Sequence, residues 1–152
     1  FGPWMAFISG FGEMLPNPEN RVTLDPTKKD KWGMALPHID CTMGPNEHKM
    51  VKQIMDDGKA MIEAAGGVVV AQANQMGTPG LGIHEMGTAR MGHDPKTSVL
   101  NKYNQAHEVP NLFCTDGAAM ASSACVNPSL TYMALSARAA HHAVERLKEG
   151  TI

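Results

Sequence analysis

The chain has 152 residues, the length of one ordinary domain, and its 43% hydrophobic and 18% charged residues are typical of a globular protein. Its formal net charge of −2 argues against a nucleic-acid-binding surface, which needs clustered positive charge. No run of about 18 apolar residues encodes a transmembrane helix, and no signal peptide is recognisable.

The first part of the chain predicts a hairpin. The turn residues of "PNP" at 16–18 precede a short alternating strand, Arg21–Leu24. After a polar loop, Met34–Cys41 is a second strand candidate, which Pro37 restricts to an edge or an irregular strand. The chain begins at Phe1 and not at a methionine, which suggests that it is a piece of a longer polypeptide.

A helix follows the hairpin. From Pro45 to Ala65, apolar residues recur at three- and four-residue steps, with Pro45 suited to the first turn and Gly66-Gly67 to the end. Val68–Ala71 then has the composition of a buried strand. Helix, tight turn and strand in this order indicate a layer packed on a sheet.

The second half of the chain is irregular until its last helix. Residues 72–111 have no sustained period, and Asn111–Gly117 is predicted as a short strand that ends in an Asp-Gly turn. A helix is predicted from Pro128 to Lys148, with Asn127 as its N-cap. Its apolar stripe comprises Leu130, Met133, Ala134, Ala137, Val144 and Leu147, and Gly150 ends it. The class is therefore α+β.

Several common site motifs are missing from the sequence. No GxGxxG, P-loop or GxSxG pattern is present, and "GTPGLG" at 77–82 has its glycines in the wrong order for a dinucleotide site. The seven histidines form no HExxH motif, and the three cysteines form no CxxC pair, which favours buried thiols over a metal site or a disulfide scaffold.

His84 and Asn127 remain as candidates, each with a structural alternative. A lone histidine in a glycine-rich loop is usually a polar loop residue, and an asparagine before proline at a helix start is usually a cap. Arg90 and Asp94 are interpreted as groups that order the loop through backbone hydrogen bonds. His93, His107, His141 and His142 are interpreted as surface residues, and "KKDK" at 28–31 as a solvated loop.

Two stretches resemble a known family. "HEMGTARMGHDPKTSV" at 84–99 and "NLFCTDGAAMASSACVNPSLTYMALSARAA" at 111–140 are similar to the C-terminal portion of the glucose–methanol–choline (GMC) oxidoreductases, which are FAD-dependent alcohol dehydrogenases and oxidases. The resemblance extends more loosely over 11–50. The HEMGTARMG form resembles bacterial sugar and polyol dehydrogenases more than the choline branch.

The resemblance implies a role for each site residue. His84 matches the histidine that takes the proton of the substrate hydroxyl, and Asn127 matches a histidine or asparagine that hydrogen-bonds the same oxygen. The positions that would contact FAD or line its ring are Asp116, Gly117, Asn127, Pro128, Ser129 and Thr131.

Elementary chemistry agrees with these roles. Oxidation of an alcohol removes a hydroxyl proton and a hydride, so it needs a positioned base and a cofactor that accepts the hydride. Histidine titrates near neutrality, whereas an asparagine amide donates to a developing alkoxide without changing charge. The N-terminus of the helix from Pro128 to Lys148 would offer a partial positive charge to a reduced flavin.

The resemblance also implies an architecture and partners. Residues 1–110 would be the C-terminal part of a substrate-binding domain, with a mostly antiparallel sheet, a packed helix and the active-site loop. Residues 111–152 would return to an FAD-binding domain as a strand and a helix. The expected partners are a small alcohol, the N-terminal FAD-binding part of the parent chain, without which this piece is expected to be inactive, and an electron-acceptor subunit. The alternative is a non-catalytic binding module that retains the motifs.

Overall fold

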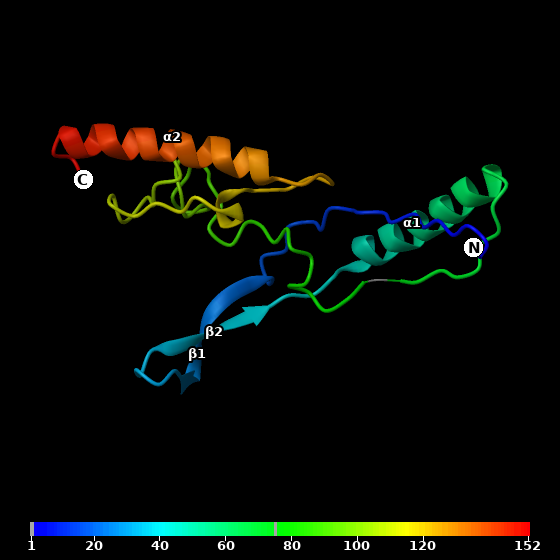
Figure 1. The fold of residues 1–152 in the computed structure, drawn as a ribbon. Coiled ribbons are helices and arrows are strands. Elements are labelled where there is room, and N and C mark those ends of the chain that lie inside the picture. Colours follow the sequence, from blue (N-terminus) through cyan, green and yellow to red (C-terminus); the bar gives the residue numbers. More distant parts are fainter. Residues whose placement is uncertain (1, 75) are drawn as a thin grey trace.

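The computed structural model describes residues 2–74 and 76–152. Over these residues the regular elements are the strands β1 (Arg21–Lys29) and β2 (Ala35–Asp40), the helices α1 (Pro45–Ala64) and α2 (Ser129–Lys148), and a short 3-10 helix, η1 (Gly117–Ala119). This composition confirms the α+β class. The N-terminus and α1 lie at one end of the molecule, and α2 and the C-terminus lie at the other (Figure 1).

The two strands form the predicted antiparallel hairpin. Val22 pairs with Ile39, and Leu24 pairs with Pro37. Proline has no backbone amide to donate, but it is tolerated here because both strands of this two-stranded sheet are edge strands. β1 is longer than predicted. It continues through an irregularity between Leu24 and Lys29, where the Asp25 carboxylate accepts the amide of Lys28 at 2.8 Å.

α1 confirms the helix predicted from the apolar period, to within one residue at its end. Glu47 in the first turn accepts the amide of Gly44, just before the helix, at 2.8 Å. The same carboxylate accepts the amide of Leu15 at 3.0 Å, and the preceding segment runs along α1, where a Cβ at Gly10 would overlap Ile54. The helix therefore holds the N-terminal segment against one face.

Two predicted strands are wrong. Val68–Ala71 is irregular, with Val68 and Val70 84% and 86% exposed, because no neighbouring strand in the described part of the chain offers it hydrogen bonds. The strand predicted at Asn111–Gly117 is reduced to one bridge between Phe113 and Gln105. The predicted layer is not seen either, since β1 and β2 are the only pair of described elements in extensive contact.

The core lies in the irregular segment between residues 84 and 120. Leu100, Ala106 and Ala119 are buried together, and the half-buried Ala89, Met91 and Cys114 pack around them. Backbone bonds close this segment on itself, for example from the Cys114 amide to the Asn104 carbonyl at 2.9 Å. The best-packed part of the molecule is therefore a loop.

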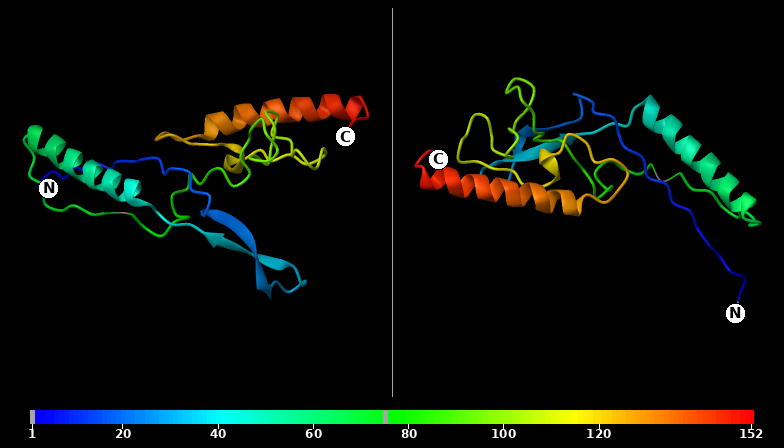
Figure 2. Two further views of the ribbon diagram at one scale, coloured as in Figure 1. Left: turned by 180° about the vertical axis from the view of Figure 1, so that it is seen from behind. Right: turned by 90° about the horizontal axis from the view of Figure 1, so that it is seen from above.

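α2 packs on this segment through a face other than the predicted stripe. Ala139 is buried, the Ser136 hydroxyl donates to the Thr115 carbonyl at 2.9 Å, and His142 stacks on Tyr103 with 3.9 Å between ring centroids. The predicted apolar stripe lies on the opposite face, and four of its members stand exposed: Leu130, Met133, Val144 and Leu147. Both views of Figure 2 show the loops on one side of α2 only.

The helix start also differs from the prediction. α2 begins at Ser129, Pro128 occupies the N-cap position, and no side chain caps the helix. The predicted N-cap role of Asn127 is therefore wrong. Its side chain is exposed and is not committed to the helix.

The chain exposes far more surface than a compact protein of its size. Its accessible area is 11839 Å², against about 7,500 Å² expected from the size scaling of folded monomers. Much of the excess is apolar, on α2, the hairpin and residues 4–11. None of the helices in the described residues combines the length and apolar character needed to cross a membrane.

Candidate active site

His84 lies in a tight turn with an uncommon backbone. Gly82 donates its amide to the Glu85 carboxylate at 2.8 Å, which closes the turn around residues 83 and 84. Ile83 between them has a φ of +58°, a left-handed conformation that is costly for a β-branched residue. Such strain persists only where the surroundings impose it, and it concentrates at functional sites. The imidazole of His84 itself is half-buried.

The segment after His84 pairs with the 3-10 turn η1. The amides of Gly87, Ala89 and Met91 donate to the carbonyls of residues 117, 118 and 119 at 3.3, 3.0 and 2.9 Å. Three successive bonds join segments that lie about thirty residues apart in the sequence. They hold the His84 loop beside the connection that leads to Asn127.

Gly117 is the point of closest approach between the two segments. It is buried, and a Cβ at this position would lie 2.9 Å from both the Glu85 carbonyl oxygen and the Tyr132 hydroxyl. Tyr132, the fourth residue of α2, donates to the Met86 sulfur at 3.4 Å. Burial and the Asp116 and Glu85 carboxylates raise the pKa of Tyr132, which keeps its hydroxyl protonated as a donor.

Asp116 caps η1. Its carboxylate accepts the Ala118 amide at 2.9 Å and lies 3.4 Å from the Cys114 sulfur. Burial first, and the neighbouring carboxylate, raise the pKa of the Cys114 thiol, so the thiol is a donor to Asp116 at neutral pH. Asp116 thus shapes the turn that contains Gly117.

The remaining predicted residues surround the start of α2. Asn127, Ser129 and Thr131 are exposed, and Pro128 is buried. The first turn of the helix holds no acidic residue, and the first-turn amides of an α-helix have no partner within the helix. An exposed, uncapped N-terminus without a carboxylate is suited to the negative charge of a reduced flavin. The unpaired amides and the partial positive charge of this helix start therefore fit an anionic flavin ring.

His84 and Asn127 flank the two paired segments: His84 lies three residues before Gly87, and Asn127 lies eight residues after Ala119. Each follows a non-glycine residue in the left-handed region: Ile83 directly precedes His84, and Ala124, with a φ of +55°, lies three residues before Asn127. Both candidates therefore stand on backbone that the surrounding contacts must hold in place.

A family model described as GMC oxidoreductase, for the C-terminal domain, matches residues 16–136. The chain belongs to the GMC oxidoreductase family. Members of this family are typically FAD flavoproteins that oxidise sugars and alcohols. The resemblance stated from the two motifs is confirmed over most of the chain.

Three relatives illustrate the range of the GMC family. The chain is 37% identical over 147 residues to 2-methyl-1,2-propanediol dehydrogenase of Mycolicibacterium austroafricanum, covering 95% of this chain and 26% of that protein. It is 38% identical over 142 residues to the fructose dehydrogenase large subunit of Gluconobacter japonicus, covering 91% and 25%. It is 28% identical over 148 residues to pyranose 2-oxidase of Tricholoma matsutake, covering 90% and 26%.

The chain thus spans about a quarter of the length of these curated relatives. Relatives named as dehydrogenases and oxidases do not favour the alternative of a non-catalytic binding module.

The structure also tests the predictions made for the other polar residues of the loop and of α2. Arg90 donates to the Thr97 carbonyl at 2.8 Å and Asp94 accepts the Lys96 amide at 2.9 Å, which confirms both as loop-ordering groups. His93 and His141 are exposed as predicted. His107, at 3.1 Å from the Ser98 hydroxyl, and His142, stacked on Tyr103, are half-buried and not simply surface residues.

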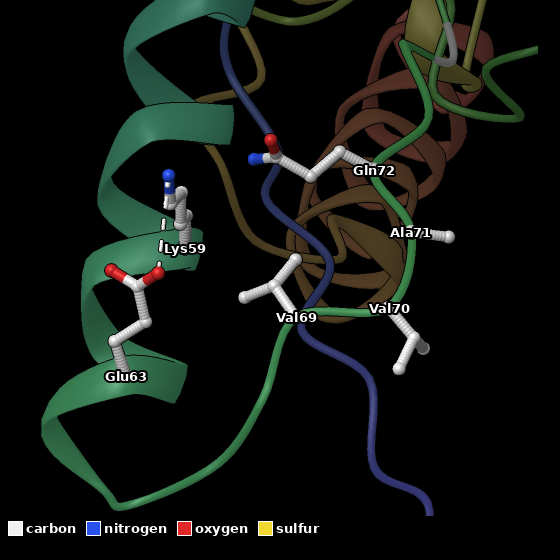
Figure 3. Close-up of a pocket in the computed structure, with 6 residues that line it drawn as sticks. All are labelled: Lys59, Glu63, Val69, Val70, Ala71 and Gln72. Atoms are coloured by element: carbon white, nitrogen blue, oxygen red, sulfur yellow. Dashed lines mark ion pairs between the residues drawn. The ribbon is translucent and has the colours of Figure 1, made fainter.

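An open hollow elsewhere in the GMC chain holds none of the predicted site residues. It lies between the C-terminal half of α1 and the segment that returns along it, and is lined by Lys59, Glu63, Val69, Val70, Ala71 and Gln72 (Figure 3). Lys59 and Glu63, one turn apart on α1, form an exposed ion pair at 3.8 Å on one side of the hollow. Within the described residues, no group of histidine, cysteine or acidic side chains is arranged to hold a metal ion.

Two residues near the site were missed by the sequence reasoning. Tyr132 contributes the hydroxyl that lies against Gly117 and Met86. Glu13 accepts the amides of Ser123 and Ala124 at 3.2 and 3.4 Å. Tyr132 precedes Ser136 and Ala139 by four and seven residues, which is the spacing of one helix face and the signal that could have identified it. Nothing in the local sequence identifies Glu13, because its partners lie 110 residues away.

Proposed function

We propose that this chain is the C-terminal part of an FAD-dependent enzyme that oxidises an alcohol to a carbonyl, with a sugar or polyol as the substrate class. When bound, FAD accepts the hydride. His84 takes the hydroxyl proton, and the Asn127 amide donates to the same oxygen as negative charge develops on it. The observation that supports this most is the pairing of residues 87–91 with 117–119, which joins the two motifs.

The remaining predicted residues would hold the flavin. Gly117, close to the Glu85 carbonyl, and Asp116 shape a tight turn beside the His84 loop. Pro128, Ser129 and Thr131 belong to the open N-terminus of α2, where unpaired amides and the helix dipole favour negative charge. Asn127 is free of a capping role and thus available to a ligand.

The division of the chain follows from the same proposal. Residues 1–110 would belong to the substrate-binding domain, and residues 111–152 would complete the FAD-binding domain. The exposed apolar stripe of α2 supports this, because a stripe of leucine, methionine and valine is stable in water only when another surface covers it. The N-terminal part of the parent chain would provide that surface. Electrons would then pass to an acceptor, such as a partner subunit.

The experiment uses the parent protein, purified without added flavin and mixed anaerobically with candidate sugars and polyols. Bleaching of the flavin absorbance reports hydride transfer. We expect His84→Ala to slow bleaching by about 10²- to 10⁴-fold, the usual contribution of a general base. We expect Asn127→Ala to slow it by about 10²-fold, as for loss of one donor to an oxyanion.

His93→Ala is the matched control, because His93 is exposed on the same loop. It should bleach at the rate of the wild-type protein. A His84→Ala variant that bleaches as fast as His93→Ala would exclude His84 as the base. A folded parent protein that never retains flavin would contradict the whole proposal.

A further inference from the structure

Glu13 joins the N-terminal segment to the loop that precedes Asn127. One of its carboxylate oxygens, Oε1, accepts the amides of Ser123 and Ala124 at 3.2 and 3.4 Å. Two successive backbone amides that converge on one oxygen form a small anion-binding concavity. Here the protein fills that concavity with its own carboxylate.

The bonded turn has a conformation that it would rarely adopt alone. Ala124 has a φ of +55°, in the left-handed region that disfavours residues with a Cβ. The Ser123 hydroxyl donates to the Ala124 carbonyl at 3.0 Å, but both residues are otherwise at or near the surface. Glu13 is thus the long-range contact that specifies this turn, three residues before Asn127.

The segment that contains Glu13 is itself anchored. Leu15, two residues further on, donates its amide to the buried Glu47 in the first turn of α1 at 3.0 Å. Further back, a Cβ at Gly12 would overlap the side chain of Met50 on the same helix. α1 therefore fixes the segment from which Glu13 reaches the turn.

We propose that Glu13 is a positioning residue for Asn127, and this inference rests on the proposed function. By holding the turn at Ser123–Ala124, the carboxylate sets the direction in which the chain enters Asn127 and then α2. Its effect on the reaction passes through Asn127. Its reach matters more than its charge, because a neutral oxygen at the same place can still accept both amides, though in weaker bonds than a carboxylate forms.

The test compares two substitutions in the parent holoenzyme. Glu13→Gln keeps the reach and an acceptor oxygen but removes the charge. Glu13→Asp keeps the charge but shortens the side chain by one methylene. We expect Glu13→Gln to retain kcat within about 3-fold, and Glu13→Asp and Glu13→Ala to lose about 10- to 100-fold in kcat, the scale expected for a misplaced group. Glu19→Ala, at an exposed position of the same segment, should leave kcat unchanged.

Two further measurements separate positioning from general stability. In the Glu13→Ala, Asn127→Ala double variant, kcat should fall no further than in Asn127→Ala alone. Hydrogen exchange of residues 121–128 should rise in Glu13→Asp and Glu13→Ala but not in Glu13→Gln. Losses that multiply in the double variant, or a Glu13→Asp variant with the wild-type kcat and exchange, would overturn the inference.

The failure of this inference differs from the failure of the proposed function. If Asn127→Ala and His84→Ala lose activity while Glu13→Ala changes neither kcat nor exchange, the function stands and the positioning role is wrong. If Asn127→Ala has the wild-type rate, the assigned site is wrong, and with it the role of Glu13, even where exchange of the turn increases.

Discussion

Side chains are more deeply buried in the irregular segment from residue 84 to 120 than in the regular elements, α1 and the β1–β2 hairpin. Leu100, in the irregular segment, is 1% exposed, whereas Leu24, in the centre of a strand, is 72% exposed. Backbone bonds between distant carbonyls and amides close the irregular segment, while the hairpin contacts little besides itself. In this chain, a regular backbone therefore does not imply that the side chains are buried.

The difference follows from what each region needs as a partner. A two-stranded hairpin or a single amphipathic helix is marginal in water until another surface covers its apolar face. The segment 84–120 finds its partners within itself and on α2. Substitutions in the two regions would test this contrast, and the largest effect is expected at Leu100.

Leu100→Ala should be the most destabilising substitution. The side chain is fully buried against Ala106 and Ala119, and its removal leaves a cavity that a backbone fixed by hydrogen bonds cannot collapse. We expect a loss of about 2–5 kcal/mol in the free energy of unfolding, measured by urea denaturation of the 152-residue chain. Leu24→Ala is the control and should cost far less. Equal losses would remove the contrast between the two regions.

Gly117→Ala should separate the two segments that form the candidate site. Its new Cβ would lie 2.9 Å from the Glu85 carbonyl, a backbone atom that cannot turn aside. We expect a loss of about 1–3 kcal/mol in stability, the usual cost of overpacking, together with slower flavin bleaching in the parent protein. Gly82→Ala is the matched control, because its Cβ would meet only the flexible Glu85 carboxylate, at 3.4 Å. Similar effects of the two substitutions would contradict the close approach at Gly117.

Leu147→Ala tests whether the exposed stripe of α2 is covered in the parent protein. Leu147 is 66% exposed, so the substitution should change the stability of the 152-residue chain by less than about 0.5 kcal/mol. In the parent protein we expect a loss above about 1 kcal/mol, because the stripe would then be buried. Thermal melting of both proteins measures the difference, with the exposed Lys148→Ala as control. Equal small losses in both proteins would mean that the stripe stays exposed.

The sequence predicts those features that depend on local chemistry. α1 follows from the spacing of its apolar residues and from Gly66, which adopts a φ of +82° just after the helix. The hairpin follows from alternation and turn residues, and the edge position of Pro37 follows from its missing amide. The loop-ordering roles of Arg90 and Asp94 were also predictable, because both side chains bond backbone groups that are near in the sequence.

Features that depend on distant partners could not be predicted in the same way. Val68–Ala71 has the composition of a strand, but a strand forms only where another offers hydrogen bonds. The apolar stripe of α2 was recognisable, yet periodicity does not say which surface covers it. The motif around Gly117 indicated its importance, whereas its contact with Glu85 and the bond of Glu13 to Ser123 needed the fold.

Glu47 should give the contact between α1 and the N-terminal segment a pH dependence. The Leu15 amide first, then the carboxyl's own amide and that of Gly44, lower the pKa of Glu47, against burial, which raises it. A lowered folded pKa means that the stabilisation is fully present above the unfolded value of about 4.3 and is lost as the pH falls through the folded value. We therefore expect the melting temperature of the wild-type chain to fall more steeply below about pH 4.3 than that of Glu47→Gln.

The control for this smallest effect is Glu63→Gln, on the exposed face of the same helix, which should follow the wild-type curve. Hydrogen exchange of the Leu15 amide gives a local measurement, since this amide should become unprotected as Glu47 takes up a proton. Parallel curves for the wild type and Glu47→Gln would show that the segment is held by its apolar contacts with α1. The anchoring of Glu13, two residues from Leu15, would then depend on packing at Gly10 and Gly12 and not on the buried carboxylate.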